Sequence, residues 1–125
     1  MTTLIDEAEG QLGRPGPLAN VRACWLARAA LEDAITVLLP DDPGHLASAR
    51  SRLSCLQVAY ADRPEVASRA EYAWSRLSEA CHQHAYALSP TYIEAQHLVG
   101  LVRQFVAAAE AWRAAPPPDG GASTA

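Results

Sequence analysis

Apolar residues recur at three- and four-residue spacing along most of this 125-residue chain. That spacing gathers them on one face of an α-helix. The pattern predicts a short helix over residues 3–12 and four longer helices over 17–39, 45–60, 64–88 and 90–113. No segment alternates apolar and polar residues for long enough to predict a strand. The sequence therefore predicts an all-α protein.

Proline, glycine and aspartate separate the predicted helices. The breaks are Gly13–Pro17, Pro40–Gly44, Asp62–Pro64 and Ser89–Pro90. Short connections of this kind join antiparallel neighbours in helical bundles. We expect an up-and-down antiparallel bundle of four long helices, preceded by the short helix.

The chain divides into three parts by composition. Residues 1–16 form an N-terminal lead-in, which is either a short helix or mobile, and residues 17–114 form the helical bundle. Residues 115–125 contain mainly proline, glycine and alanine. Such a segment cannot bury enough apolar surface to offset the cost of ordering it, so we expect a disordered tail.

Charge and hydropathy narrow the range of partners. The net charge is −4, which disfavours non-specific binding to duplex DNA. No apolar run reaches the roughly 18 residues that span a bilayer, and the first residues lack the pattern of a signal peptide. We therefore expect a cytoplasmic protein without membrane contact, whose three cysteines are reduced thiols.

The densest group of reactive side chains lies near the end of the predicted helix 64–88. Residues 78–86 contain Cys81, His82, His84 and Tyr86. Arg76 precedes His82 by six positions, so the two residues are about 600° apart around an ideal helix, which is a net 240°. They share a face only where the helix is distorted.

This segment resembles the signature of the HEPN superfamily, small helical bundles of prokaryotic toxin–antitoxin and phage-defence systems. That signature is an arginine, four to six residues, then a histidine, often followed by a small residue and an aromatic one. Arg76 and His82 have five residues between them, while His84-Ala85-Tyr86 matches the second part. Position 79, where the tightest spacing from His84 places the arginine, is Glu79.

The resemblance implies a metal-independent endoribonuclease that needs no cofactor. A histidine would act on the 2′-hydroxyl or the leaving oxygen, and an arginine would stabilise charge on the phosphate. The catalytic candidates are Arg76, His82 and His84, and the binding candidates are Tyr86, Arg50 and Arg52. The resemblance also implies a homodimer, because HEPN nucleases pair two motifs across a cleft.

Other interpretations of the same residues stay open. The chain could be a non-catalytic interaction module that dimerises or docks on a partner protein through its apolar helix faces. The histidines could be packing residues, and the tryptophans are typical of a core or an interface. Cys81 and His84 could supply two metal ligands, but the paired spacings of a closed zinc site are absent.

Overall fold

The structure, a computed structural model, consists of helices. It describes residues 3–16, 18–39, 48–84 and 89–114. The helices are α1 (Leu4–Leu12), α2 (Leu18–Leu38), α3 (Ala49–Ala59), α4 (Pro64–His84) and α5 (Tyr92–Ala114). The described residues contain no strand, which confirms the all-α class. The predicted tail 115–125 lies outside the described residues.

Short polar side chains cap the starts of α1 and α5. At the start of α1, the Thr3 hydroxyl accepts from the Asp6 amide, and the Asp6 carboxylate accepts from the Thr3 amide. The same reciprocal pair joins Thr91 and Glu94 at the start of α5. Each pair satisfies two backbone donors that have no partner within the helix.

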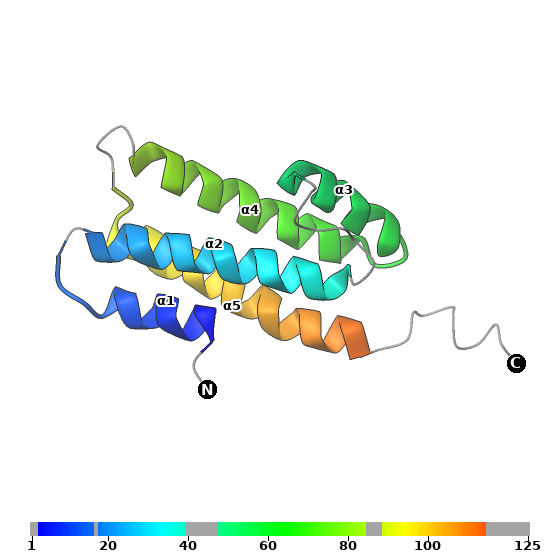
Figure 1. The fold of residues 1–125 in the computed structure, drawn as a ribbon, viewed down its shortest axis with the longest axis horizontal. Coiled ribbons are helices and arrows are strands. Elements are labelled where there is room, and N and C mark those ends of the chain that lie inside the picture. Colours follow the sequence, from blue (N-terminus) through cyan, green and yellow to red (C-terminus); the bar gives the residue numbers. More distant parts are fainter. Residues whose placement is uncertain (1–2, 17, 40–47, 85–88, 115–125) are drawn as a thin grey trace, which may run out of the picture.

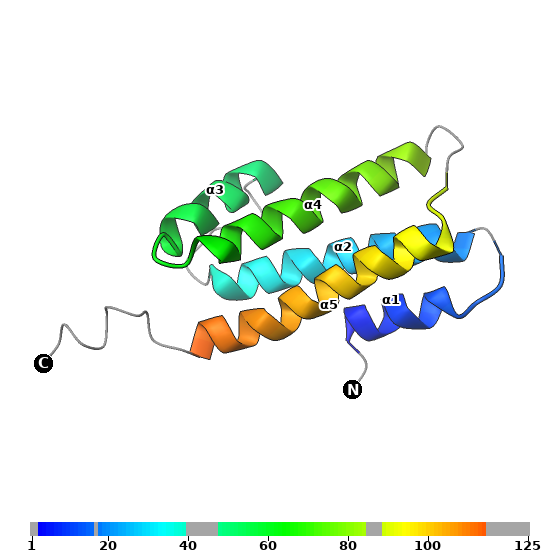
Figure 2. The ribbon, with the colours of Figure 1, turned by 180° about the vertical axis from the view of Figure 1, so that it is seen from behind.

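Helix α2 is the centre of the molecule and packs against α1, α4 and α5. Figure 1 shows that α2 and α5 run in one direction, whereas α1 and α4 run in the opposite one. Helix α3 lies on the outer side of α4 and touches α2 only slightly. The short N-terminal helix therefore packs against the central helix more extensively than α3 does, although α3 also contributes buried Leu53 and Leu56 to the core. The view from behind shows α1 alongside α5 (Figure 2).

Small side chains allow these helices to approach closely. Half of the buried residues of α2 are alanines, and α5 contributes buried Ala95 and Ala109. The largest side chain of the core is Phe105, whose ring meets the ring of Trp112 edge-on at a centroid distance of 5.6 Å. Because an alanine side chain fills little space, the backbones of neighbouring helices can come close together. In many other helix pairs, larger side chains interdigitate and keep the backbones further apart.

Ion pairs fasten α1 to α5. Arg103 of α5 donates to Asp6 at 2.5 Å and to both oxygens of Glu9 at 2.7 Å. The hydrogen bond from Arg103 lowers the pKa of Asp6 to about 2, and the bonds from Thr3 act in the same direction. The apolar side of α1 buries Ile5 and Ala8 against the bundle.

None of the five described helices combines the length and the apolar character that crossing a membrane requires.

Candidate functional site between α2 and α4

Arg76 and His82 lie on different sides of α4. Arg76 is exposed, and its guanidinium carbon lies 6.0 Å from the centre of the Tyr72 ring, which borders a depression between α4 and α5. His82 is also exposed, but it borders a different depression, between α2 and α4. The six-residue separation on a regular helix produces this result. Arg76 is not among the described residues that line the depression of His82.

The other residues that the sequence suggested as catalytic or binding residues lie in different parts of the structure. Arg50 lies on the surface of α3, 3.7 Å from the carboxylate of Glu71. Arg52 donates to the main-chain oxygen of Glu32 at 3.3 Å and contacts the hydroxyl of Thr36. Arg52 therefore connects α3 to α2. The side chain of His84 and all of Tyr86 lie outside the described residues.

The depression of His82 contains an arginine from a different helix. Its volume is about 570 Å³, and its described lining is Trp25, Arg28, Ser78, Glu79, Cys81 and His82. The guanidinium carbon of Arg28 lies 4.4 Å from the centre of the Trp74 ring and 5.5 Å from that of Trp25. Glu32, one turn along α2, is 3.9 Å from Arg28. Two aromatic rings and one carboxylate thus fix the position of this cation.

Trp25 forms an accessible rim to the depression. Its side chain is 51% exposed, which is high for a residue with so large an apolar ring. Trp74, in contrast, packs against the core, and the guanidinium of Arg28 lies over its ring. One tryptophan therefore supports the guanidinium, and the other presents a ring to solvent beside it.

The floor of the depression is a buried thiol that is unsuited to nucleophilic chemistry. Burial raises the pKa of Cys81, although the positive charge and a hydrogen bond of Arg28 act in the opposite direction. Burial also raises the pKa of Cys24 to about 12. Because the thiolate is the reactive form, both groups act as small apolar side chains at neutral pH. Cys55 is exposed.

Ser78 adds a polar atom without a partner. Its hydroxyl oxygen is buried and makes no hydrogen bond within the described structure, and the residue lines the same depression. A buried hydroxyl that lacks a partner costs free energy, and a bound ligand that supplies an acceptor removes that cost. The groups that the depression offers to a ligand are therefore a guanidinium and an imidazole, while the Ser78 hydroxyl stays buried.

The depression exists because α3 is short. A helix of 11 residues is about 16 Å long, whereas the 21 residues of α2 and of α4 each span about 31 Å. Arg52 places α3 beside the second half of α2, near Glu32 and Thr36. The first half of α2 and the last turns of α4 extend beyond α3, as Figure 1 shows. Trp25 and His82 lie in that uncovered part.

Sequence reasoning missed Arg28 and Trp25 as site residues. Their three-residue spacing places both on one face of α2, which was a usable signal. The association of Arg28 with Trp74 and His82 depends on how α2 packs against α4, and periodicity does not specify that.

Two further observations complete the description of the site. Within the described ranges, no group of three or more histidine, cysteine or acidic side chains could hold a metal ion. Comparison with protein-family models, with curated proteins and with solved structures found no match.

Proposed function

We propose that this protein binds single-stranded RNA in the depression between α2 and α4 and cleaves it without a metal. The observation that carries the proposal is that Trp25, Arg28 and His82 line one depression. Arg28 takes the phosphate-binding role that the sequence assigned to Arg76. The HEPN resemblance supports RNA as the substrate and a toxin–antitoxin or phage-defence setting.

The binding step uses the exposed ring and the fixed cation. Bases of single-stranded RNA stack on accessible aromatic rings, and one such contact contributes about 1–3 kcal/mol. Trp25 offers the ring, and Arg28 beside it offers N–H donors for the adjoining phosphate. Because two rings already hold Arg28, little side-chain entropy is lost on binding.

The chemical step uses the imidazole of His82. The 2′-hydroxyl loses its proton to the imidazole, and its oxygen attacks the adjacent phosphorus. The bond from phosphorus to the 5′-oxygen breaks, and that oxygen takes a proton from water, while the imidazolium returns its proton to the solvent. The products are a 2′,3′-cyclic phosphate and a 5′-hydroxyl. Histidine is suited to such proton transfer near neutral pH, and Arg28 stabilises the charge that develops on the phosphate.

The acidic groups near the site predict which RNA is bound. Glu79 lines the depression and Glu32 pairs with Arg28, so the local positive charge is small. Few phosphates can then be neutralised, and the affinity should depend only weakly on salt. We therefore propose short single-stranded segments, not duplexes, as the substrate.

An RNA-cleavage assay tests the proposal directly. End-labelled single-stranded RNA is incubated with the wild type and with His82→Ala, Arg28→Gln, His84→Ala and Arg76→Gln variants. His82→Ala removes the acid–base group and should reduce cleavage by about 100-fold or more, and Arg28→Gln should reduce cleavage by a similar factor. The matched control is Arg50→Gln, which should cleave as the wild type does.

The outcomes of this assay separate the possible sites. RNA with 2′-deoxyribose at every position should remain intact, because the attacking hydroxyl is missing. Full activity of both His82→Ala and Arg28→Gln would refute this site. Loss of activity in Arg76→Gln alone would favour Arg76, the arginine of the sequence motif, as the phosphate-binding residue. A wild type that neither binds nor cleaves RNA would leave the interaction module as the function.

A second candidate function, the interaction module, has its own supporting observation. A depression of about 300 Å³ lies between α2 and α5, next to the first residues of α1, and most of its lining is aliphatic. Val37 in this lining is 41% exposed. We propose that a second copy of the chain covers this surface and forms a homodimer through it. Sedimentation at increasing concentration tests this, and Val37→Glu should shift the protein to monomer.

For the fold, we propose the up-and-down antiparallel bundle expected from the sequence, with α1 as one of its four members. The alternating directions of α1, α2, α4 and α5 support this arrangement.

A further inference from the structure

We infer that a second RNA contact lies on the side of α4 that faces α5, where Arg69, Tyr72 and Arg76 form one stripe. In this contact the Tyr72 ring receives a base, and the two arginines bind the phosphates on either side of it. The inference rests on the proposed RNA function for the identity of the ligand. It assigns a role to Arg76, which the depression of His82 does not use.

The stripe follows from helical geometry. Residues three and seven positions after Arg69 return to nearly the same direction on a helix, so Arg69, Tyr72 and Arg76 share a face. The two arginines are about 10 Å apart along the axis, with the tyrosine between them. This order, cation–ring–cation, matches the alternation of phosphates and bases along a single strand.

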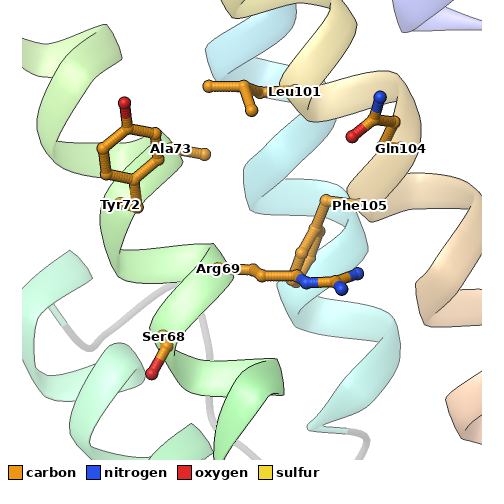
Figure 3. A pocket seen from close by; sticks show the side chains of 7 residues that line it. All are labelled: Ser68, Arg69, Tyr72, Ala73, Leu101, Gln104 and Phe105. Carbon is orange, nitrogen blue, oxygen red and sulfur yellow. The ribbon is translucent and has the colours of Figure 1, made fainter.

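A depression beside the stripe has room for a base. It has a volume of about 330 Å³, and its lining includes Arg69 and Tyr72 from α4 and Gln104 and Phe105 from α5. Figure 3 shows the Tyr72 ring on one side and Gln104 on the other, with Phe105 below. The half-exposed tyrosine can stack on a base, and the Gln104 amide can both donate to and accept from its edge.

The charges around this depression favour a phosphate. None of the described residues that line it is a carboxylate. Neither Arg69 nor Arg76 forms an ion pair with a residue in the described ranges; Arg69 lies 5.8 Å from the Trp112 ring, and Arg76 lies 6.0 Å from the Tyr72 ring. Arg50, in contrast, is paired with Glu71. An arginine over an aromatic ring keeps its N–H donors available for a bidentate contact with phosphate.

The two RNA contacts are within reach of one strand. Tyr72 and His82 are ten residues apart on α4, which is about 15 Å along the helix. A strand that crosses the exposed surface of α4 therefore passes from Trp25 and His82 on one side to Tyr72 on the other. A strand of two or three nucleotides occupies one contact only.

Equilibrium binding of two oligonucleotides tests this inference. The probes are fluorescein-labelled single-stranded 2′-O-methyl RNAs of about three and about ten nucleotides, which resist cleavage. Fluorescence anisotropy measures the affinity of the wild type and of Tyr72→Ala, Tyr72→Phe, Arg69→Gln/Arg76→Gln and Arg28→Gln. The matched control is Arg14→Gln, which removes an exposed arginine from the connection between α1 and α2.

Loss of the ring should weaken binding of the long probe by about ten-fold, the effect expected for one stacked base. Tyr72→Phe should restore the affinity, and the double arginine variant should weaken binding and its dependence on salt. The affinity of the short probe for the wild type should fall well below that of the long probe.

Unchanged binding of the long probe to Tyr72→Ala and to the double arginine variant would overturn the second contact. If Arg28→Gln still weakened binding in that case, the first site would stand alone. If the wild type bound neither probe, both this inference and the proposed function would be wrong.

Discussion

The buried thiol of Cys24 should make the protein lose stability as the pH rises above about 9. The side chain lies on α2 with no exposed surface. Burial raises its pKa from 9.0 to about 12, and the neighbouring Cys81 and Glu94 act in the same direction. Between these two values the unfolded chain carries a thiolate, whereas the folded chain keeps the proton. The folded state then binds more protons, so the free energy of unfolding falls as the pH rises.

The size of the effect follows from the two pKa values. The stability contributed by the protonated thiol is complete below pH 9.0 and is lost progressively up to about pH 12. At about pH 10.5 the loss amounts to about 2 kcal/mol, because each pH unit above the unfolded pKa is worth about 1.4 kcal/mol. Domains of this size have 5–15 kcal/mol of stability in total, so the loss is measurable.

Urea unfolding of the wild type and of Cys24→Ala at about pH 8 and about pH 10.5 measures this loss. Tyrosine ionisation and general charge effects act on both proteins and cancel in the difference. The missing sulfur destabilises the variant by an amount independent of pH, so its disadvantage should shrink by about 2 kcal/mol between the two conditions. Cys55→Ala, at an exposed position, should show no such change. A difference between wild type and Cys24→Ala that stays constant with pH would refute the reasoning.

Three further predictions concern α5, α1 and the thiols. Gly100 lies within α5 and a Cβ there would meet no atom within 4 Å; Gly100→Ala should therefore stabilise the protein by about 1 kcal/mol, and a lowered urea midpoint would contradict this. The depressed pKa of Asp6 means that its bond to Arg103 stabilises the fold above pH 3.8 and is lost as the pH falls through about 2; amide resonances of α1 should move in that window, and they should move at a higher pH in Arg103→Gln. A thiol reagent should modify one cysteine of the native protein, Cys55, and all three in denaturant; rapid modification of a second one would show that α2 and α4 open readily.

The fold class and the helix positions were predictable because local chemistry determines them. Gly13 follows the last residue of α1 and Pro64 begins α4, at breaks that the sequence predicted, whereas α3 begins at Ala49 and not at residue 45. The docking of α1 was not predictable in the same way. Its sequence shows an apolar stripe, but the partners of that stripe and the bond from Arg103 to Asp6 come from a helix nearly 100 residues away.

The candidate site was predictable only in part, for a related reason. The angle between Arg76 and His82 follows from the sequence alone, and it indicated that a regular helix would separate them. The identity of the arginine near His82 depends on the packing of α2 on α4. Trp25 also has a periodicity typical of a core residue, yet the short α3 leaves it half-exposed.

The alanines of α2 determine which parts of the protein can tolerate mutation. Three helices pack against α2, and Ala23 and Ala27 are fully buried, so a larger residue at either position would push α2 away from a neighbouring helix. Helix α3 touches mainly α4 and has long exposed stretches. In a saturation-mutagenesis library selected for folding, α2 should accept little beyond glycine and serine at its alanines, while α3 should accept most polar residues. New surface properties would therefore arise more readily on α3 than on the central helix.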